Sequence, residues 1–468
     1  MLRLSGVDAA FLALETPENH MHVLATCVFD PTGVDGGFTV ERVRALVAGR
    51  LDLLPPFRRR IVNVPFQLDH PIWVEDPDFD VEHHVRRATV PSPGGRAELA
   101  DLTAEIAGRQ LDRTRPLWEI WVVDGLEHGH VALIAKVHHA CIDGVSGVEL
   151  MAGLFDLEPD PAPRDEPDDW EPDRVPTEVE LLLGSIPSIA NRPALAARAV
   201  GNMAKSALRV GQKLRDGEVS SGVPFAAPRT SLNGPITPHR KVAFVSIPLD
   251  DVKRVKNAFG VTVNDVILAV CTGALRRFLE RGDELPERPL VAAIPTSVRS
   301  EDHRGLMGNQ LSAMFTELPT QIVDPVERLR AVRSVTNGAK QIHDEIGGRT
   351  IHDWAEIAAP QVFSQGIRFY KQFSAQFPMH NVMVSNVPGP AFAVYCAGAR
   401  AVSLHPMGPI FHSAALNITV MSYLGSVDFG FLACRETVPE VDVIADFVPE
   451  AFAELLKAAD ELVGEPGS

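Results

Sequence analysis

The sequence predicts an α/β protein built of two sandwich-like lobes. Strand-like apolar runs and helical 3–4 spacing recur in both halves of the 468-residue chain. Between the halves, residues 156–176 hold nine acids against two arginines and supply −7 of the net charge of −17. Because prolines remove backbone donors and the acids repel one another, this segment is expected to be a linker. We therefore place the lobes at residues 1–155 and 236–468, joined by a linker and crossover helices at 156–235.

The elements are expected in the following order. In the first lobe Thr39 is positioned to cap a helix over 40–50, and residues 117–124 and 130–138 read as an antiparallel hairpin. In the second lobe Thr262 is positioned to cap a helix that carries Asn264 and Asp265. The pattern predicts further strands at 242–247, 289–294, 311–317, 380–384, 416–422 and 427–433, with helices near 250–259 and over 442–463.

Residues 195–214 are a basic, amphipathic helix candidate within an acidic chain. Their apolar positions follow helical spacing, and Arg198, Lys205, Arg209 and Lys213 decorate the remainder. Two interpretations stay open: the helix lies on an anionic lipid surface, or it packs on the body with its basic face in water.

The strongest chemical signal is the motif that follows the strand-like run 131–137. It brings His138, His139, Asp143 and Gly144 to one strand end. Histidine is the side chain best suited to accept a proton near neutral pH, and a neighbouring carboxylate can fix its tautomer. Glycine accepts the backbone angles of a sharp turn. Before any resemblance is considered, a satisfied polar histidine at a strand end remains an alternative.

A zinc site is disfavoured by the same spacing. Adjacent residues on a strand point to opposite faces, so His138 and His139 make a poor chelating pair. The other adjacent pair, His83 and His84, lies in a charged stretch and is interpreted as solvated surface. We predict no metal.

Several short motifs together resemble one enzyme family. His-His-x-x-x-Asp-Gly is typical of the coenzyme A-dependent acyltransferase superfamily, which includes chloramphenicol acetyltransferase and peptide-synthetase condensation domains. The ordered set as a whole resembles the bacterial wax ester synthase/diacylglycerol acyltransferases from about residue 4 to about residue 460. Its further members are Leu4–Leu12, Met21-His22-Val23, Pro116-Leu117-Trp118-Glu119, Val263–Ala269, Pro295-Thr296-Ser297-Val298-Arg299, Gly308-Asn309-Gln310 and Ser385–Pro390.

The resemblance implies a fold and a set of roles. It implies two chloramphenicol-acetyltransferase-like lobes, each a mixed sheet flanked by helices, with a tunnel between them and the histidine motif at its midpoint. It assigns the general base to His139 and a supporting role to His138. Apart from the resemblance, a carboxylate that turns back at a strand end usually pairs with an arginine and pins its loop, so Asp143 would pair with Arg299, Arg58 or Arg60, or would form a plain turn. Gly144 is placed with the acyl-CoA contacts.

Two side chains of the second lobe are candidate donors. Asn264 lies near a predicted helix N-terminus, where negative charge is favoured, so it would orient substrate or stabilise the oxyanion, unless it merely caps the helix. Ser297 is a weaker donor candidate.

Trp118, in the first lobe, would either shape the acyl channel or be a buried structural residue.

Composition excludes some classes of protein. The net charge of −17 and the lack of a basic stripe argue against nucleic acid as a partner. The five cysteines at 27, 141, 271, 396 and 434 are scattered and read as free thiols in a reducing compartment. No secretory signal and no transmembrane run are expected, so the predicted location is the cytoplasm, with peripheral contact at the inner membrane face or lipid droplets.

The sequence thus predicts an acyl-CoA-dependent O-acyltransferase. It would transfer a long acyl chain from acyl-CoA, a co-substrate, to diacylglycerol or a fatty alcohol, with no cofactor. Two alternatives remain: a sister enzyme acting on a polyketide, peptide or glycolipid, and a non-catalytic lipid-binding or droplet protein. Chain length, acceptor preference and oligomeric state are not encoded in any motif.

Overall fold

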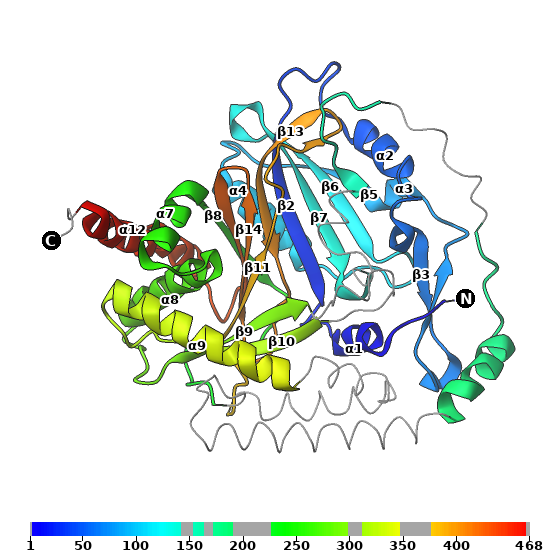
Figure 1. Ribbon diagram of the computed structural model, residues 1–468. Helices are drawn as coiled ribbons and strands as arrows, with labels where there is room; N and C mark the ends of the chain where they lie inside the picture. Colours follow the sequence, from blue (N-terminus) through cyan, green and yellow to red (C-terminus); the bar gives the residue numbers. More distant parts are fainter. Residues whose placement is uncertain are drawn as a thin grey trace.

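Two six-stranded mixed sheets form the two lobes of the protein. The computed structural model describes residues 2–141, 153–162, 172–190, 226–297, 311–346 and 376–464. The first sheet has the strand order β12-β13-β2-β7-β6-β5 and the second β10-β9-β11-β14-β15-β8. Each contains parallel and antiparallel pairs. In Figure 1 the first sheet lies to the right and the second to the left of the centre. The predicted two-lobed α/β architecture is confirmed.

The strands have the following bounds. In the first sheet they are β2 (His22–Asp30), β5 (Val85–Thr89), β6 (Trp118–Asp124), β7 (Val131–His138), β12 (Tyr395–Cys396) and β13 (Ala399–Met407). In the second sheet they are β8 (Arg240–Pro248), β9 (Leu290–Ser297), β10 (Leu311–Leu318), β11 (Val382–Val387), β14 (Leu416–Tyr423) and β15 (Ser426–Cys434). A small antiparallel sheet, ordered β1-β4-β3, holds β1 (Leu2–Arg3), β3 (Arg59–Val62) and β4 (Ile72–Glu75).

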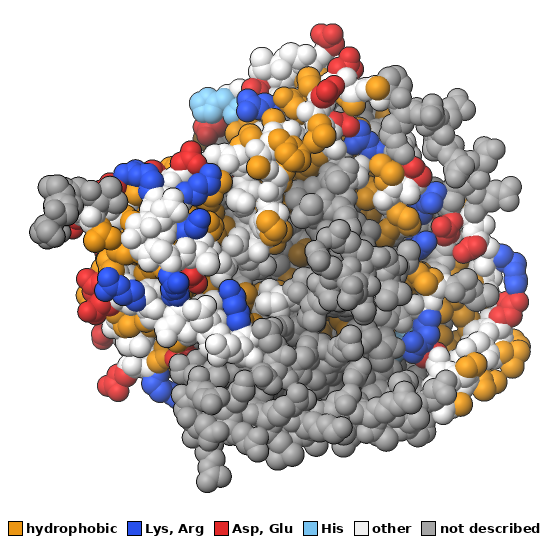
Figure 2. Space-filling model, in the orientation of Figure 1, with side chains coloured by type: hydrophobic (Ala, Val, Ile, Leu, Met, Phe, Trp, Pro, Cys, Tyr) orange, Lys and Arg blue, Asp and Glu red, His pale blue; other side chains and the backbone are white. Residues whose placement is uncertain are grey.

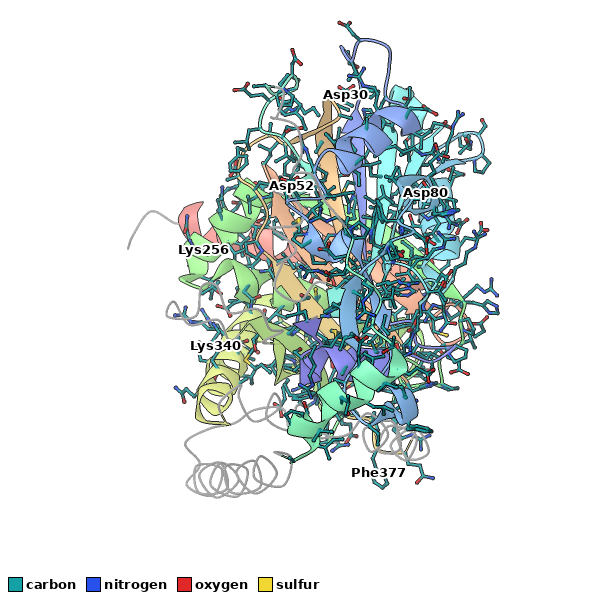
Figure 3. All side chains as sticks on the ribbon, turned by 90° about the vertical axis from the view of Figure 1, so that its right-hand side faces the viewer. Asp30, Asp52, Asp80, Lys256, Lys340 and Phe377 are labelled. Carbon is teal, nitrogen blue, oxygen red and sulfur yellow. The ribbon has the colours of Figure 1, made fainter. Side chains whose placement is uncertain are left out.

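Helices flank both sheets (Figure 1). They are α1 (Gly6–Leu14), α2 (Val40–Ala48), α3 (Val81–His84), α4 (Arg96–Ala107), α7 (Leu249–Phe259), α8 (Val263–Arg281), α9 (Pro325–Ile346) and α12 (Val441–Gly464). Residues 178–190 are also helical. Figure 1 shows α7, α8, α9 and α12 gathered on the left beside the second sheet. In the turned view of Figure 3, Lys256 of α7 and Lys340 of α9 lie on the side away from Asp80 of the first lobe.

The predicted elements form for the expected local reasons. Thr39 Oγ1 accepts the Arg42 N–H at 3.3 Å and so caps α2. Strands β6 and β7 pair antiparallel, as the hairpin pattern predicts. The predicted strands and helices of the second lobe are all present within a few residues of their expected bounds. The helix candidate at 195–214 and the helix start expected after Gly144 lie outside the described residues.

The two lobes are joined because a strand from the second half of the chain completes the sheet of the first lobe, a pairing that the sequence pattern does not reveal. β13 belongs by sequence to the second lobe, yet it pairs with β2 from Arg400↔Asp30 to Met407↔Leu24. The predicted boundaries at 1–155 and 236–468 therefore describe chain segments, whereas the first sheet is completed by residues 395–407. A single apolar core crosses the junction and includes Ile134 of β7 and Val245 of β8.

Asp428 of β15 fastens this exchanged strand to the second sheet. Its side chain is fully buried; Oδ2 accepts the Leu404 N–H of β13 at 2.9 Å, and Oδ1 accepts the Ser246 hydroxyl of β8 at 2.7 Å. Gly430, on the same strand, lies so close to β13 that a Cβ there would stand 2.1 Å from the Pro406 carbonyl oxygen. Both contacts hold the lobes in one fixed arrangement.

The first part of the predicted linker is ordered against the first lobe. The Asp156 backbone exchanges two hydrogen bonds with Tyr395, at 2.7 and 2.8 Å, and its carboxylate pairs with Arg50 at 2.5 Å. Residues 163–171 lie outside the described part. Among the described helices none is by itself long and apolar enough to cross a membrane, although α7 and α8 together reach that composition across a bend of 102°.

Candidate functional site

The end of β7 is fixed from both sides. The His138 N–H donates to the Leu117 carbonyl at 2.9 Å, and the His139 N–H donates to the Met21 carbonyl at 2.9 Å. A 3₁₀ turn, His139–Cys141, follows directly. Met21 has a φ of 47°, a left-handed conformation that costs a non-glycine residue energy. This strained residue directs its carbonyl at the second histidine of the motif.

The two imidazoles lie in different surroundings. His138 is completely buried; its Nδ1 accepts the Ala140 N–H at 3.1 Å, and its Nε2 lies 3.6 Å from Glu15 Oε2. His139 is partly exposed and stacks on Phe11, with ring centroids 4.1 Å apart and an interplanar angle of 24°. One ring therefore belongs to the protein interior and the other to its accessible side.

The surroundings of both rings lower their pKa and so favour the neutral form at physiological pH. Burial, reinforced by the neighbouring His138, lowers the pKa of His139 to about 4. Burial also lowers the pKa of His138, although Glu15 opposes this shift. The His139 Nδ1 atom is buried without a hydrogen-bond partner among the described residues. A neutral imidazole with an unused nitrogen has a lone pair available to accept a proton.

Glu15 is a site residue that the sequence analysis misses. It immediately follows α1, and its carboxylate lies close to His22 as well as to His138 and Arg113. Since its partners come from three separate segments, no short motif contains them. The sequence offers one indication of this role: Phe11 and Glu15 are four residues apart, so on a helix they would lie on the same face.

Asn264 sits where predicted, in the first turn of α8, but it does not cap the helix. The cap is Thr262, whose Oγ1 accepts the Asp265 N–H at 3.1 Å, while Asp265 in return accepts the Thr262 N–H at 2.8 Å. The alternative that Asn264 is only a cap is therefore wrong. Its Oδ1 accepts from Asn386 Nδ2 at 3.4 Å, which brings two of the sequence motifs together.

The remaining predicted site residues fall partly outside the described structure. Asp143, Gly144 and Arg299 lie outside it, and the structure describes Ser297 only as the backbone end of β9, paired with Leu311 of β10. Of the other candidate partners of Asp143, Arg60 contacts Asp76 at 3.5 Å. The second half of the motif thus remains a prediction.

Trp118 is a structural residue, and the surface interpretation of His84 is wrong. Trp118 is fully buried, donates its Nε1–H to the Phe57 carbonyl at 2.9 Å and stacks on Phe57 at 4.3 Å. The His84 ring also stacks on Trp118, with the ring centroids 4.4 Å apart, and its Nδ1 forms a hydrogen bond with the Trp118 carbonyl. The charged residues around His84 suggested an exposed side chain, but packing against Trp118, which is distant in the sequence, buries it. Of the two adjacent histidines, only His83 is exposed.

The five cysteines are free and buried. Burial raises the pKa of the Cys141 thiol beside the histidines, so this sulfur stays protonated and is no nucleophile. In the described part of the chain no group of three or more His, Cys, Asp or Glu side chains is arranged to hold a metal ion.

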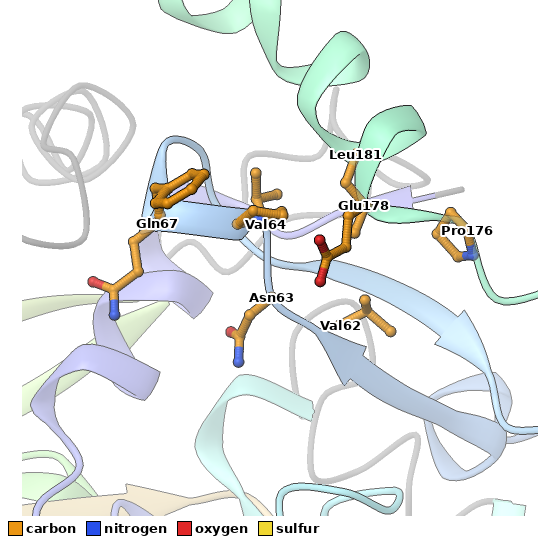
Figure 4. A pocket seen from close by; sticks show the side chains of 9 residues that line it. Val62, Asn63, Val64, Gln67, Pro176, Glu178 and Leu181 are labelled. Atoms are coloured by element: carbon orange, nitrogen blue, oxygen red, sulfur yellow. The ribbon is translucent and has the colours of Figure 1, made fainter.

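A cavity of about 600 Å³ lies away from the histidines. It is bounded by residues 62–67 of the small sheet and by Pro176, Glu178 and Leu181. In Figure 4, Val62, Asn63 and Val64 lie below the helical segment that carries Glu178 and Leu181. None of the predicted site residues lines it, so it is not the predicted tunnel.

Comparison with known proteins identifies the family. Residues 4–267 match the wax ester synthase/diacylglycerol acyltransferase catalytic domain, and residues 307–456 match the C-terminal domain of the same family. A Mycobacterium tuberculosis protein whose name proposes diacylglycerol O-acyltransferase activity is 40% identical over 467 residues, covering 98% of this chain and 91% of that protein. A second such protein of the same organism is 36% identical over 457 residues, covering 97% of this chain and 99% of that protein.

Solved structures agree. The wax ester synthase/diacylglycerol acyltransferase of Marinobacter aquaeolei VT8 aligns with a TM-score of 0.70 at 29% identity, covering 98% of this chain and 99% of that one. The first condensation domain of the calcium-dependent antibiotic synthetase aligns with a TM-score of 0.55 at 14% identity, covering 98% and 96%, and shares the fold. The resemblance drawn from the motifs is confirmed: the chain belongs to the wax ester synthase/diacylglycerol acyltransferase family and is an acyltransferase.

Proposed function

We propose that the protein transfers a long-chain acyl group from acyl-CoA to the hydroxyl of diacylglycerol or a fatty alcohol, with His139 as general base. The observation that carries this proposal is the placement of His139. It is the partly exposed member of the pair, it is neutral at pH 7, and its backbone is fixed by the Met21 carbonyl. The names of the family and of the relatives support the choice of donor and acceptors.

The chemistry needs one proton transfer in each direction. The acceptor hydroxyl gives its proton to His139 as its oxygen bonds to the thioester carbon. The resulting oxyanion requires donors, and Asn264 is our candidate, with Ser297 as a second. When the carbon–sulfur bond breaks, the imidazolium returns the proton to the CoA sulfur. Because a thiolate is a good leaving group, we propose that no cofactor or metal takes part and that acyl-CoA is only a co-substrate.

Replacing His139 by alanine tests the base. We expect the rate of thiol release from palmitoyl-CoA, with diacylglycerol or hexadecanol as acceptor, to fall by roughly 10²–10⁴-fold. His83→Ala is the matched control, since His83 is an exposed histidine on the same lobe. Wild-type turnover by a folded His139→Ala protein would rule out the assignment.

The same assay separates the alternatives. Transfer to a glycolipid, peptide or polyketide acceptor, with none to diacylglycerol or hexadecanol, would indicate the sister activity. Binding of acyl-CoA without thiol release under any acceptor would indicate a lipid-binding protein.

We also propose that the protein works from the cytoplasm at a lipid surface, because both acceptors are insoluble in water. Support comes from exposed apolar side chains on the segment between β3 and β4 and on the helix at 178–190. Phe66 is 78% exposed at its tip and Leu183 62% exposed on the helix. Figure 2 shows orange side chains at the lower right, where Figure 1 places this helix.

A further inference from the structure

Glu15 is a buried carboxylate whose burial needs an explanation. Its side chain is 3% exposed, and a carboxylate taken out of water is costly unless it is paired. Arg113 provides the pairing: its Nε donates to Oε2 at 2.7 Å, and its Nη2 donates to the same carboxylate and to the Leu12 carbonyl at 2.7 Å. Arg113 thereby binds both the carboxylate and the C-terminal end of α1.

The carboxylate faces the paired ends of two strands. Glu15 Oε2 lies 3.6 Å from His138 Nε2, and Oε1 lies 3.8 Å from His22 Nε2. His22 and His138 are direct neighbours in the β2–β7 register. These distances exceed those of hydrogen bonds, so the contacts are electrostatic. Among the described residues, Glu15 is the one carboxylate in contact with His138.

The contact selects one tautomer of His138. Its Nδ1 accepts the Ala140 N–H, so the proton of the neutral ring is on Nε2, the atom that faces Glu15. Burial alone would raise the pKa of Glu15, but His138 and Arg113 together lower it below its ordinary value. An anion therefore faces the positive N–H edge of the ring, which holds the ring in this orientation.

Helix α1 connects this carboxylate to the second histidine. Phe11 lies one turn before Glu15 and stacks on His139. The helix therefore touches both rings of the motif, one through an anion and the other through an aromatic face. Figure 1 shows α1 at the lower ends of β2 and β7.

We propose that Glu15, held by Arg113, is a positioning residue for acyl transfer. It fixes the tautomer of His138 and docks α1 so that Phe11 keeps the His139 ring in its reactive orientation. This inference rests on the proposed role of His139 and adds a residue that acts through it.

The test is the substitution Glu15→Gln, alone and combined with His139→Ala. Glutamine keeps the shape but removes the charge. We expect kcat to fall by about 10- to 100-fold while KM for palmitoyl-CoA changes less than about twofold, because misorientation of the base affects the reaction more than substrate binding. Glu105→Gln is the matched control, since Glu105 forms an exposed pair with Arg109.

The double variant separates this inference from the proposed function. If Glu15 acts through His139, Glu15→Gln causes no further loss in the His139→Ala background. A multiplicative loss there, or a kcat for Glu15→Gln equal to that of the wild type, overturns the positioning role. A fully active His139→Ala protein instead overturns the proposed base.

Glu15→Asp guards against failure of the glutamine variant to fold. Aspartate keeps the charge but withdraws it by one methylene, so we expect a smaller loss of the same kind, confined to kcat. An unchanged kcat in a folded Glu15→Asp protein likewise overturns the positioning role.

Discussion

At the scale of the residue, burial determines the chemistry of the histidine pair. His138 and His139 are consecutive, yet one faces an anion in the interior and the other an aromatic ring at an accessible edge. Strand geometry alone gives two opposite faces. The contacts of α1 then differ on the two faces: Glu15 faces His138, and Phe11 stacks on His139.

The lowered pKa of His139 predicts an unusual pH profile. A general base is active when deprotonated, and burial lowers this pKa to about 4. We therefore expect kcat/KM to stay nearly constant between about pH 7 and 5 and to fall only toward pH 4, instead of falling near the 6.5 of an ordinary histidine. Brief assays at each pH, followed by return to pH 7 to verify recovery, measure this. An acid limb centred near 6.5 would contradict the lowered pKa of this half-buried base.

At the scale of the element, α1 and the helix at 178–190 differ in whether their apolar side chains are buried or exposed. α1 directs Phe11 and Glu15 inward to the histidines. The helix at 178–190 packs Leu181 inward with Ile72 and Val74 but exposes Val179, Leu183 and Ile186 on its other face. Residues 181–190 contain no charged side chain. An exposed apolar face of this kind is typical of a surface that meets lipid or another protein.

Removing apolar side chains from this helix tests the lipid surface. We expect Val179→Ser combined with Leu183→Ser to weaken binding to phosphatidylcholine vesicles containing diacylglycerol by at least about tenfold, because each side chain loses roughly 1.5 kcal/mol or more of apolar burial. Val323→Ser with Val402→Ser is the control, as both are exposed elsewhere. Equal sedimentation of the two double variants with vesicles would exclude this helix as the contact.

Local patterns predicted α2, the β6–β7 hairpin and most elements of the second lobe, but they missed β1 to β5, α1, α3, α4, α9, β12 and β13. The hairpin β6–β7 and the Thr262 cap depend on neighbouring residues, which a pattern contains. β13 was missed because its strand character depends on pairing with β2, at least 370 positions earlier, and because Pro406 weakens its local signal. Glu15 was missed for the same reason, whereas His139 was found because the motif is contiguous.

At the scale of the whole molecule, buried histidines make stability dependent on pH. Burial lowers the pKa of several of them: His22, His138, His139, His380 and His405. The unfolded chain binds their protons below about pH 6.5, whereas the folded protein does so only at lower pH. Stability is therefore complete above about pH 6.5 and is lost as the pH falls from there toward 4.

Urea unfolding between pH 7.5 and 4.5 checks this. We expect the free energy of unfolding to decrease steadily below about pH 6.5, with His380 alone contributing up to about 3 kcal/mol, since its pKa is lowered to about 4. In the His380→Phe variant, the free energy of unfolding should decrease less over this pH range, by the contribution of His380. Phenylalanine is a suitable replacement because the histidine ring is buried without a hydrogen-bond partner among the described residues. A free energy of unfolding that is constant over this range would contradict the prediction.

The exchanged strand β13 has a consequence for synthesis on the ribosome. Until residue 407 has emerged, β2 is an unprotected edge whose backbone donors and acceptors await a partner. The first lobe therefore completes its sheet only after most of the second lobe has been synthesised, and a nascent or truncated chain ending near residue 267 exposes the unpaired edge of β2. We therefore expect the isolated amino-terminal half to aggregate and the full chain to depend on chaperones during production.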